Sequence, residues 1–380
     1  MHILEYSEEH AAFRHQLREF LAHEVMPHVD AWEEQRQVPR EAWKGLGRRG
    51  FLCPTVPAVF GGPGKDFLHS VIVIEELAKT NHSGLMAGLH SDVVVPYIES
   101  YASSELKKRY LPGCVSGDLI AAVAMTEPGA GSDLSSLQTT AEERGEEVVI
   151  NGTKTFISNG ISCDLVVLAA RDPEVDNPYE AVSLYVVEAG TPGFEKGRKL
   201  DKMGMHSQDT AELFFQNCRI PAVNRLGEKG RGFFMLMDKL QQERLVCSIG
   251  ALAAAEFVWE RTVEHCKQAG HNGRPKSKAQ DVQFALVEMA TEIKMGRTFV
   301  DKLIAEHIRG EQVVVETSMA KYWTTDLAWK VARECLDLWG EEGLSEDCPI
   351  VRAFRDIRVM SIYAGTNEIM KGIAAKFMGL

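Results

Sequence analysis

The sequence predicts an α+β protein in three parts, helical at both ends and β in the middle. Apolar residues recur at spacings of three and four up to about residue 120, the period then falls to two, and the helical period returns at Gly232. The last part has long helical segments joined by short loops, which is typical of an antiparallel bundle, at about 233–268, 278–307, 313–339 and 350–378. We expect domains at residues 1–119, 120–228 and 229–380.

The first part shows a helical apolar stripe, as in Phe13, Leu17 and Phe20, interrupted by prolines and by the glycine-rich run 61–64. Its residues 45–50 read GLGRRG and match GxGxxG, a pattern in which a strand-to-helix turn approaches a pyrophosphate. No predicted strand precedes this pattern and no βαβ unit follows it. We therefore expect the end of a helix there, rather than a dinucleotide site.

The middle part contains runs typical of strands, namely LIAAVAM, EEVVINGTKTFIS, DLVVLAA, AVSLYVV and AELFF. The second run includes Asn151 and Gly152, and Asn-Gly is favoured in two-residue hairpin turns. We therefore expect that run to fold back on itself as a β-hairpin.

Composition and charge exclude several classes of protein. The chain has 380 residues, 45% of them hydrophobic, and a formal net charge of −12, so it lacks the basic footprint of a nucleic-acid-binding protein. Its most apolar stretch, 245–258, is too short and too polar for a membrane span. The N-terminal segment is acidic where a signal peptide is basic, so we expect a cytoplasmic protein.

The eight cysteines are scattered along the chain, and none has the CxxC spacing. This pattern argues against a zinc site and against a disulfide framework. We expect structural thiols and no bound metal.

Two segments of the β part carry candidate binding residues. MTEPGAGSD, at 125–133, has three small residues followed by Ser132, so its backbone N–H groups and a hydroxyl can reach a pyrophosphate; an ordinary β-turn at Pro128-Gly129 is the alternative. NGTKTFISNG, at 151–160, places Phe156 and Ser158 on one strand face, although alone it is only a hairpin strand.

These two segments, followed by IYAGTNEIMKGI at 362–373, resemble the acyl-CoA dehydrogenase family over essentially the whole chain. The segments GLHSDVVVPYI, KGRKLDKMGMHSQDTAELFF and QQERL resemble its long-chain and isovaleryl branch. The resemblance implies an N-terminal helical domain, a middle β-barrel-like domain and a C-terminal four-helix bundle, with FAD between the last two. The implied activity is α,β-dehydrogenation of an acyl-CoA thioester to the trans-2-enoyl product.

The resemblance also implies roles for individual residues. Those expected to contact FAD are Met125, Thr126, Gly131, Ser132, Phe156, Ser158, Thr366, Asn367 and Glu368. The thioester carbonyl is expected to accept a hydrogen bond from a backbone N–H of the loop containing Ala364 and from a ribityl hydroxyl of FAD, with Ser132 and Arg244 also at the substrate. The reduced flavin would pass its electrons to electron-transferring flavoprotein.

The catalytic base is expected at Glu243. Many family members carry a Glu in YEGT, but this chain reads Tyr363-Ala364-Gly365-Thr366, and a methyl group cannot remove a proton. In the long-chain and isovaleryl branch the Glu precedes an Arg on a bundle helix, as Glu243 precedes Arg244 here. Glu243 also shares an apolar helix face with Leu236 and Cys247, and burial there should raise its pKa toward neutrality.

Less specific interpretations of these two residues remain open. Glu243 could simply pair with Lys239 one turn earlier, for a few tenths of a kcal/mol. Arg244 could be an ordinary surface residue.

The chain departs from the family at positions that face a neighbouring subunit's FAD. Ala269 and Asn272 stand where relatives carry Arg and Phe, and Asp337 and Glu341 stand where they carry Gln and Gly. The added carboxylates should oppose phosphate binding. The basic residues that follow, Arg274, Lys276 and Lys278, either compensate or form a solvated loop.

Three hypotheses follow from the resemblance and these departures. The chain is a homotetrameric or homodimeric dehydrogenase, or one subunit of a hetero-oligomer completed by a homologous chain, or a tailoring enzyme for carrier-protein-bound acyl groups. Gly84, Ala87 and Gly88 are expected near a tunnel for a long or branched acyl chain, or else mark close helix contacts.

Overall fold

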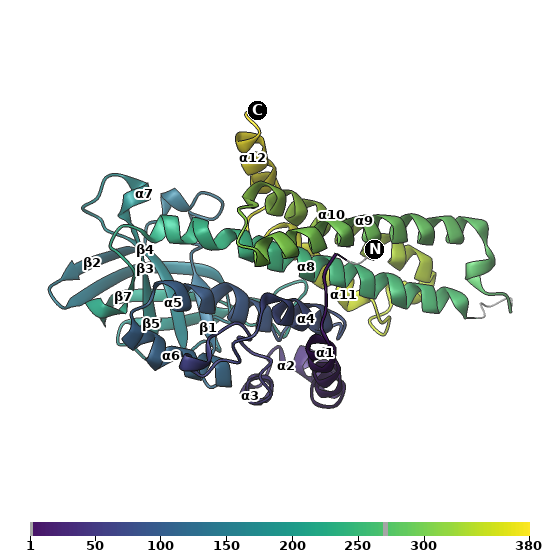
Figure 1. Ribbon diagram of the computed structural model, residues 1–380, viewed down its shortest axis with the longest axis horizontal. Coiled ribbons are helices and arrows are strands. Elements are labelled where there is room, and N and C mark those ends of the chain that lie inside the picture. The colour runs from purple at the N-terminus through teal and green to yellow at the C-terminus, as the bar shows by residue number, and fades with distance from the viewer. Residues whose placement is uncertain (1–2, 269–272) are drawn as a thin grey trace.

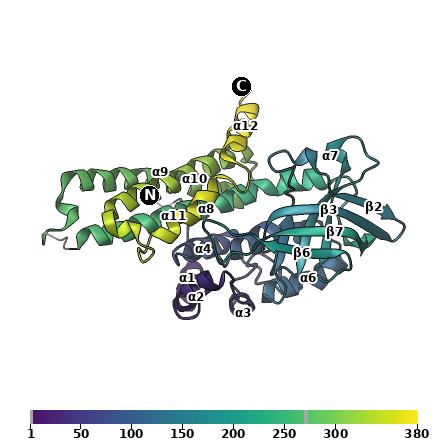
Figure 2. The same cartoon turned by 180° about the vertical axis from the view of Figure 1, so that it is seen from behind.

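The computed structural model describes residues 3–268 and 273–380 and shows three parts (Figure 1). A sheet lies at one end, a helical bundle at the other, and the N-terminal helices cover one side of both (Figures 1 and 2). The N-terminal helices are α1 (Glu8–Phe20), α2 (Val29–Gln35), α3 (Arg40–Arg48), α4 (Phe67–Ala78), α5 (Val95–Tyr101) and α6 (Ser104–Ser116). The predicted order, helical then β then helical, is confirmed.

The GLGRRG segment lies in α3 and in the turn that ends it. The helix stops at Arg48, and Gly50 takes the left-handed conformation with φ of 72°. A Cβ on Gly47 would lie 2.1 Å from the carbonyl oxygen of Ser116, so glycine permits α3 to touch the end of α6. The expectation that a helix ends there is confirmed.

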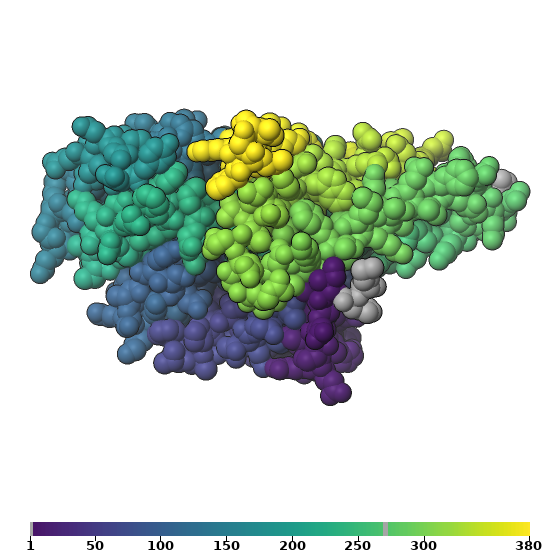
Figure 3. Space-filling model, turned by 45° about the horizontal axis from the view of Figure 1, so that its top comes forward, coloured from purple at the N-terminus to yellow at the C-terminus, as the bar shows by residue number. Residues whose placement is uncertain are grey.

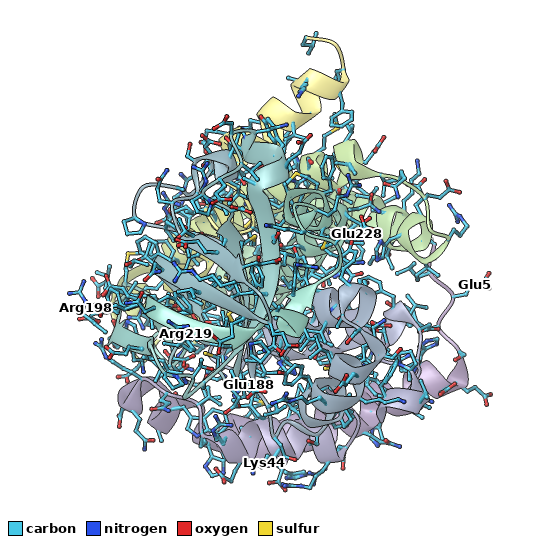
Figure 4. The ribbon with its side chains drawn as sticks, turned by 90° about the vertical axis from the view of Figure 1, so that its left-hand side faces the viewer. Glu5, Lys44, Glu188, Arg198, Arg219 and Glu228 are labelled. Atoms are coloured by element: carbon cyan, nitrogen blue, oxygen red, sulfur yellow. The ribbon has the colours of Figure 1, made fainter. Side chains whose placement is uncertain are left out.

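The middle part is an eight-stranded mixed sheet in the order β6-β7-β3-β2-β4-β5-β8, with β1 parallel to β4. Its strands are β1 (Ala121–Ala124), β2 (Thr140–Arg144), β3 (Glu147–Ser158), β4 (Leu165–Arg171), β5 (Val182–Glu188), β6 (Phe194–Lys199), β7 (Thr210–Pro221) and β8 (Arg225–Leu226), with α7 (Pro178–Ala181) before β5. Arg219 of β7, labelled in Figure 4, has an exposed side chain that pairs with Glu147 of β3 at 3.0 Å. Glu188, at the end of β5, accepts from the hydroxyl of Tyr110 on α6 at 2.7 Å and so joins the sheet to the N-terminal helices.

The predicted hairpin at Asn151-Gly152 is wrong. β3 runs unbroken through both residues, and the turn that joins β2 to β3 contains Gly145, with φ of 68°. Gly152 is instead required by a close approach, because a Cβ there would lie 2.4 Å from the Oγ1 of Thr139. The pairing of β3 with β7 shifts register at this position.

The bundle consists of α8 (Gly232–Lys267), α9 (Gln280–Ile308), α10 (Val314–Trp339), α11 (Val351–Ile357) and α12 (Asn367–Phe377). The fourth expected segment, 350–378, is therefore two helices rather than one. Ala364 and Gly365 interrupt it with φ of 54° and 87°, and Thr366 caps α12 by accepting from the N–H of Ile369. α12 projects where the bundle meets the sheet domain (Figures 1 and 3).

Three hydrophobic cores hold these parts together. One lies among the N-terminal helices and one face of the sheet, a second within the bundle, and a third inside the sheet domain. Helix α4 contributes Ile72 and Leu77 to the first and Val71 and Ile74 to the second. No helix of the described residues is long and apolar enough to cross a membrane, and all eight cysteines are buried and unpaired.

Candidate active site

The segment after β1 forms a turn whose backbone is open. Glu127 and Ala130 exchange backbone hydrogen bonds of 2.8 and 3.2 Å, so Pro128 and Gly129 occupy the middle of the turn. A Cβ on Gly129 or Gly131 would meet nothing within 4 Å. The β-turn interpretation is therefore right, and the same turn leaves room for a ligand against its backbone.

Strand β3 holds this turn in place. The buried ammonium of Lys154 donates to the Glu127 carboxylate at 2.7 Å and to the carbonyl of Met125 at 3.0 Å. The N–H of Thr155 donates to the carbonyl of Thr126 at 3.0 Å. The structure thus places Met125 and Thr126, which are expected to contact FAD, next to Lys154 and Thr155 of β3.

Phe156 and Ser158 flank the buried Ile157 at the end of β3. Phe156 is 67% exposed, Ile157 between them is buried, and Ser158 is half-buried. Sequence reasoning missed the backbone conformation of Phe156, whose φ of 57° is left-handed and coincides with a register shift against β7. An exposed aromatic ring at a strand bulge offers a flat surface for a ring-shaped ligand.

On α8, Glu243 presents a carboxylate oxygen, Oε2, that is buried and has no hydrogen-bond partner among the described residues. Burial raises the pKa of Glu243 to about 7, while Arg244 and Lys321 oppose that rise. The alternative pairing with Lys239 is not found; the ammonium of Lys239 lies 3.3 Å from Asp238 instead.

Arg244 is not a surface residue. It is 4% exposed, and its Nη1 donates to the hydroxyl of Ser318 on α10 at 3.2 Å. Its Nε atom is buried without a described partner. The interpretation of Arg244 as a plain surface arginine is therefore wrong.

Residues 363–366, here called the 363–366 loop, are the last part of the connection between α11 and α12 and directly precede α12. Ala364, Gly365 and Thr366 in it are half-buried, Asn367 behind it is buried, and Glu368 is exposed. Ala364 carries no ionisable group, so its side chain cannot act as a base. The loop is anchored by Lys321, a buried α10 residue whose Nζ donates to the carbonyl of Gly365 at 2.7 Å.

The segment between β6 and β7 joins the sheet to the bundle. Gln208 donates to the side-chain oxygen of Asn159, just after β3, at 2.8 Å. The N–H of Met205 donates to the carboxylate of Asp356 on α11. The two halves of the candidate site are therefore fixed against each other by one segment.

Sequence reasoning missed Lys154, Lys321 and this connecting segment. Each lysine is a single charged residue within an apolar strand or helix, and only the folded chain shows which carbonyls accept from it. The one available signal was that a lysine within an apolar strand or helix must find hydrogen-bond acceptors if the fold buries it.

Two of the four positions that depart from the expected family pattern are described by the structure. Asp337, in the last turn of α10, and Glu341, in the 3-10 turn that follows, are both exposed, whereas Ala269 and Asn272 fall outside the described residues. Lys276 donates to the carbonyls of Leu338 and Trp339 at 3.1 and 3.3 Å, so it caps α10 rather than standing free in solvent.

Comparison with known proteins identifies this arrangement. Residues 7–118, 122–218 and 230–379 match the N-terminal, middle and C-terminal domains described for acyl-CoA dehydrogenases. The chain is 44% identical to the mouse mitochondrial long-chain specific acyl-CoA dehydrogenase over 372 residues, which cover 98% of this chain and 86% of the relative. The chain belongs to the acyl-CoA dehydrogenase family.

Solved structures agree with this assignment. An acyl-CoA dehydrogenase from Geobacillus kaustophilus has a TM-score of 0.97, 52% identity and 99% coverage of both chains. A chain from a structure described as the electron transferring flavoprotein of Acidaminococcus fermentans has a TM-score of 0.94 and 30% identity, with 99% coverage of both. The protein is thus an oxidoreductase that dehydrogenates acyl-CoA thioesters with FAD as its cofactor. The open glycine turn and the exposed ring of Phe156 fit a flavin nucleotide.

Proposed function

We propose that Glu243 is the base that removes the α-proton of the acyl thioester. The observation that supports this role is its buried Oε2, which has no hydrogen-bond partner among the described residues, together with a pKa of about 7. A base with a pKa near the working pH is both ionised and strong enough to take a weakly acidic proton. Ala364 leaves the 363–366 loop without a competing carboxylate.

The remaining site residues bind and orient. We assign FAD contacts to Met125, Thr126, Gly131, Ser132, Phe156, Ser158, Thr366, Asn367 and Glu368, and substrate contacts to Ser132, Arg244 and the backbone of Ala364. The open turn at 129–131 would receive the pyrophosphate, because backbone N–H groups without side chains in the way can approach an anion. The three domains are assigned to residues 1–119, 120–228 and 229–380.

In the proposed reaction, Glu243 takes the α-proton at its carboxylate while the thioester oxygen accepts a hydrogen bond from the Ala364 N–H. That hydrogen bond stabilises the negative charge that develops on the oxygen, an effect worth several kcal/mol in a site that excludes water. Bound FAD supplies the acceptor for the β-hydride. The product is the trans-2-enoyl thioester.

The partners and setting of the enzyme are part of the same proposal. We assign electron-transferring flavoprotein as the acceptor, a cytoplasmic location, and a homotetramer or homodimer as the assembly. The 44% identity to a long-chain specific enzyme favours a long acyl-CoA substrate. Two hypotheses compete with this assignment: completion of the site by a homologous partner chain, and a substrate bound to a carrier protein. Experiments on the purified protein test both.

The test of the base is Glu243→Gln, which keeps the size of the side chain and removes its basicity. Turnover of acyl-CoA thioesters of several lengths, with a dye as electron acceptor, should fall by at least about 100-fold while bound FAD is retained. Glu260→Gln, an exposed position on the same helix, serves as the control and should be unchanged. A Glu243→Gln protein that keeps more than about a hundredth of the activity contradicts the assignment.

The same preparation decides between the assemblies and the substrates. FAD absorbance in the chain purified alone supports a homo-oligomer. A colourless protein that gains FAD only with a co-expressed homologue supports the hetero-oligomer. Faster turnover of a carrier-bound thioester than of the matching CoA thioester supports the tailoring enzyme.

A further inference from the structure

Lys321 is a fully buried lysine in the interior of the bundle. It lies on α10, and its residue exposure is 0%. Its ammonium donates to the Gly365 carbonyl at 2.7 Å and to the Oδ1 of Asn367 at 3.1 Å. A buried cation destabilises a protein unless its donors find acceptors, so these two contacts account for its place in the interior. They also tie both neighbours of Thr366 to α10.

Helix α10 holds Asn367 through further contacts. The Nδ2 of Asn367 donates to the Asp326 carboxylate at 2.8 Å and to the carbonyl of Tyr322 at 3.2 Å. Its Oδ1 also accepts from the hydroxyl of Thr325 at 3.2 Å. The first residue of α12 is therefore fixed by one face of α10, and the left-handed residues before it are held in place by Lys321.

The charges of Lys321 and Arg244 both lower the pKa of Glu243 and so oppose the effect of burial. Among the described residues, Cys247 on α8 and Tyr97 on α5 also interact electrostatically with this carboxylate. Burial raises the pKa of Cys247 to about 11 and that of Tyr97 further, so both are neutral at pH 7. Arg244 and Lys321 are the charges that remain, and of these two it is Lys321 that donates a hydrogen bond to the 363–366 loop.

We propose that Lys321 is a positioning residue of the dehydrogenation, which fixes the backbone of the 363–366 loop and at the same time presents a cation to the Glu243 carboxylate. This inference rests on the proposed role of Glu243 as the base. One side chain then couples the group that removes the proton to the amide that stabilises the resulting charge. Loss of the cation should therefore affect the ionisation of the base as well as the order of the loop.

The variants are Lys321→Met, which keeps the length and removes the charge, and Lys321→Arg, which keeps the charge. Lys330→Met is the matched control, since Lys330 lies on the same helix but pairs with Glu292 at 2.8 Å on the bundle surface. All are made in the full chain loaded with FAD. Asn367→Ala is the further variant, because it loosens the loop and leaves the cation beside Glu243.

The first readout is the pH dependence of kcat/KM. In Lys321→Met, the pH at which kcat/KM reaches half of its plateau on the acidic side (the midpoint) should rise by about one unit. The reason is that a neighbouring positive charge no longer favours the ionised form of Glu243. Lys321→Arg, Asn367→Ala and Lys330→Met should keep the parent midpoint. A Lys321→Met enzyme with a lower plateau but the parent midpoint shows a merely structural lysine and overturns the proposal.

The second readout needs no turnover. Amide hydrogen exchange in the segment 362–369 should be faster in Lys321→Met and in Asn367→Ala than in the parent and in Lys330→Met. Parent-like exchange in both variants overturns the anchoring role, even if Lys321→Met loses FAD. The two hypotheses fail separately: an active Glu243→Gln enzyme defeats the assignment of the base, whereas an unmoved midpoint with an active Lys321→Met enzyme defeats this inference alone.

Discussion

The ammonium of Lys154 lies 2.7 Å from the carboxylate of Glu127, and both residues are buried, at 0% and 6% exposure. Glu127 also accepts from the N–H groups of Gln138 and Thr139 at 2.7 and 3.0 Å. This ion pair therefore joins β3 to the open turn proposed to receive the FAD pyrophosphate. The shape of the turn therefore depends on a contact between two residues that are not themselves assigned to FAD binding.

Lys154→Met should destabilise the sheet domain and weaken FAD binding. It leaves the Glu127 carboxylate buried without its cation, and breaking a buried pair in this way costs about 3–5 kcal/mol. Urea denaturation gives the free energy of unfolding, and titration of the apoprotein with FAD gives the affinity. Arg219→Met is the control, because it removes an exposed pair with Glu147 worth at most about 1 kcal/mol. Equal effects of the two variants would refute the role of the buried pair.

The pH dependence of the reaction should follow the ionisation of Glu243. Its pKa is raised to about 7 by burial, and only the deprotonated carboxylate can accept a proton. Activity, measured as kcat/KM, should therefore rise as the pH increases through about 7. A profile that stays flat between pH 5.5 and 8.5 would show that another group removes the proton.

Ala364→Glu should restore part of the activity lost in Glu243→Gln. Ala364 already has a Cβ at its φ of 54°, so a longer unbranched side chain adds no new backbone restriction. A carboxylate on the 363–366 loop can approach the same α-carbon, although less well aligned, and a recovery of roughly tenfold over the single variant is expected. Ala364→Gln in the same background has the same size without a base, so equal turnover in both double variants would argue against rescue by the carboxylate.

Asp92→Asn should stabilise the protein at alkaline pH. Asp92 is 2% exposed, both of its carboxylate oxygens lack a partner among the described residues, and burial raises its pKa to about 7. The folded state keeps a proton that the unfolded state releases above its pKa of 3.8, so stability falls as pH rises between these values.

The check is urea denaturation at pH 5 and pH 8. Asp92→Asn should exceed the parent in free energy of unfolding at pH 8 by more than it does at pH 5. Asp347→Asn, at an exposed position, serves as the control. A difference from the parent that is the same at both pH values would contradict the assignment of this titration to Asp92.

The order of helices and strands could be predicted because hydrophobic period depends on local sequence. Asn151-Gly152 was misread because the same dipeptide suits a hairpin and a close backbone approach, and only the position of Thr139 distinguishes them. The interruption at Ala364 was missed since the helical period continues on both sides of it. Glu243 could be found from its place on an apolar stripe, but its lack of a partner follows from helices far away in the sequence.

Helix α4 has a consequence for any attempt to divide this enzyme. Its side chains are embedded in two different cores, so the first 118 residues pack against the bundle as well as forming an N-terminal domain. A shortened chain starting at β1 would expose the face of α8 that Val71 and Ile74 now cover, and that apolar surface would promote aggregation. Engineering by domain exchange should therefore move the N-terminal helices together with the bundle, and any replacement of the sheet domain has to keep the sheet face that packs on those helices.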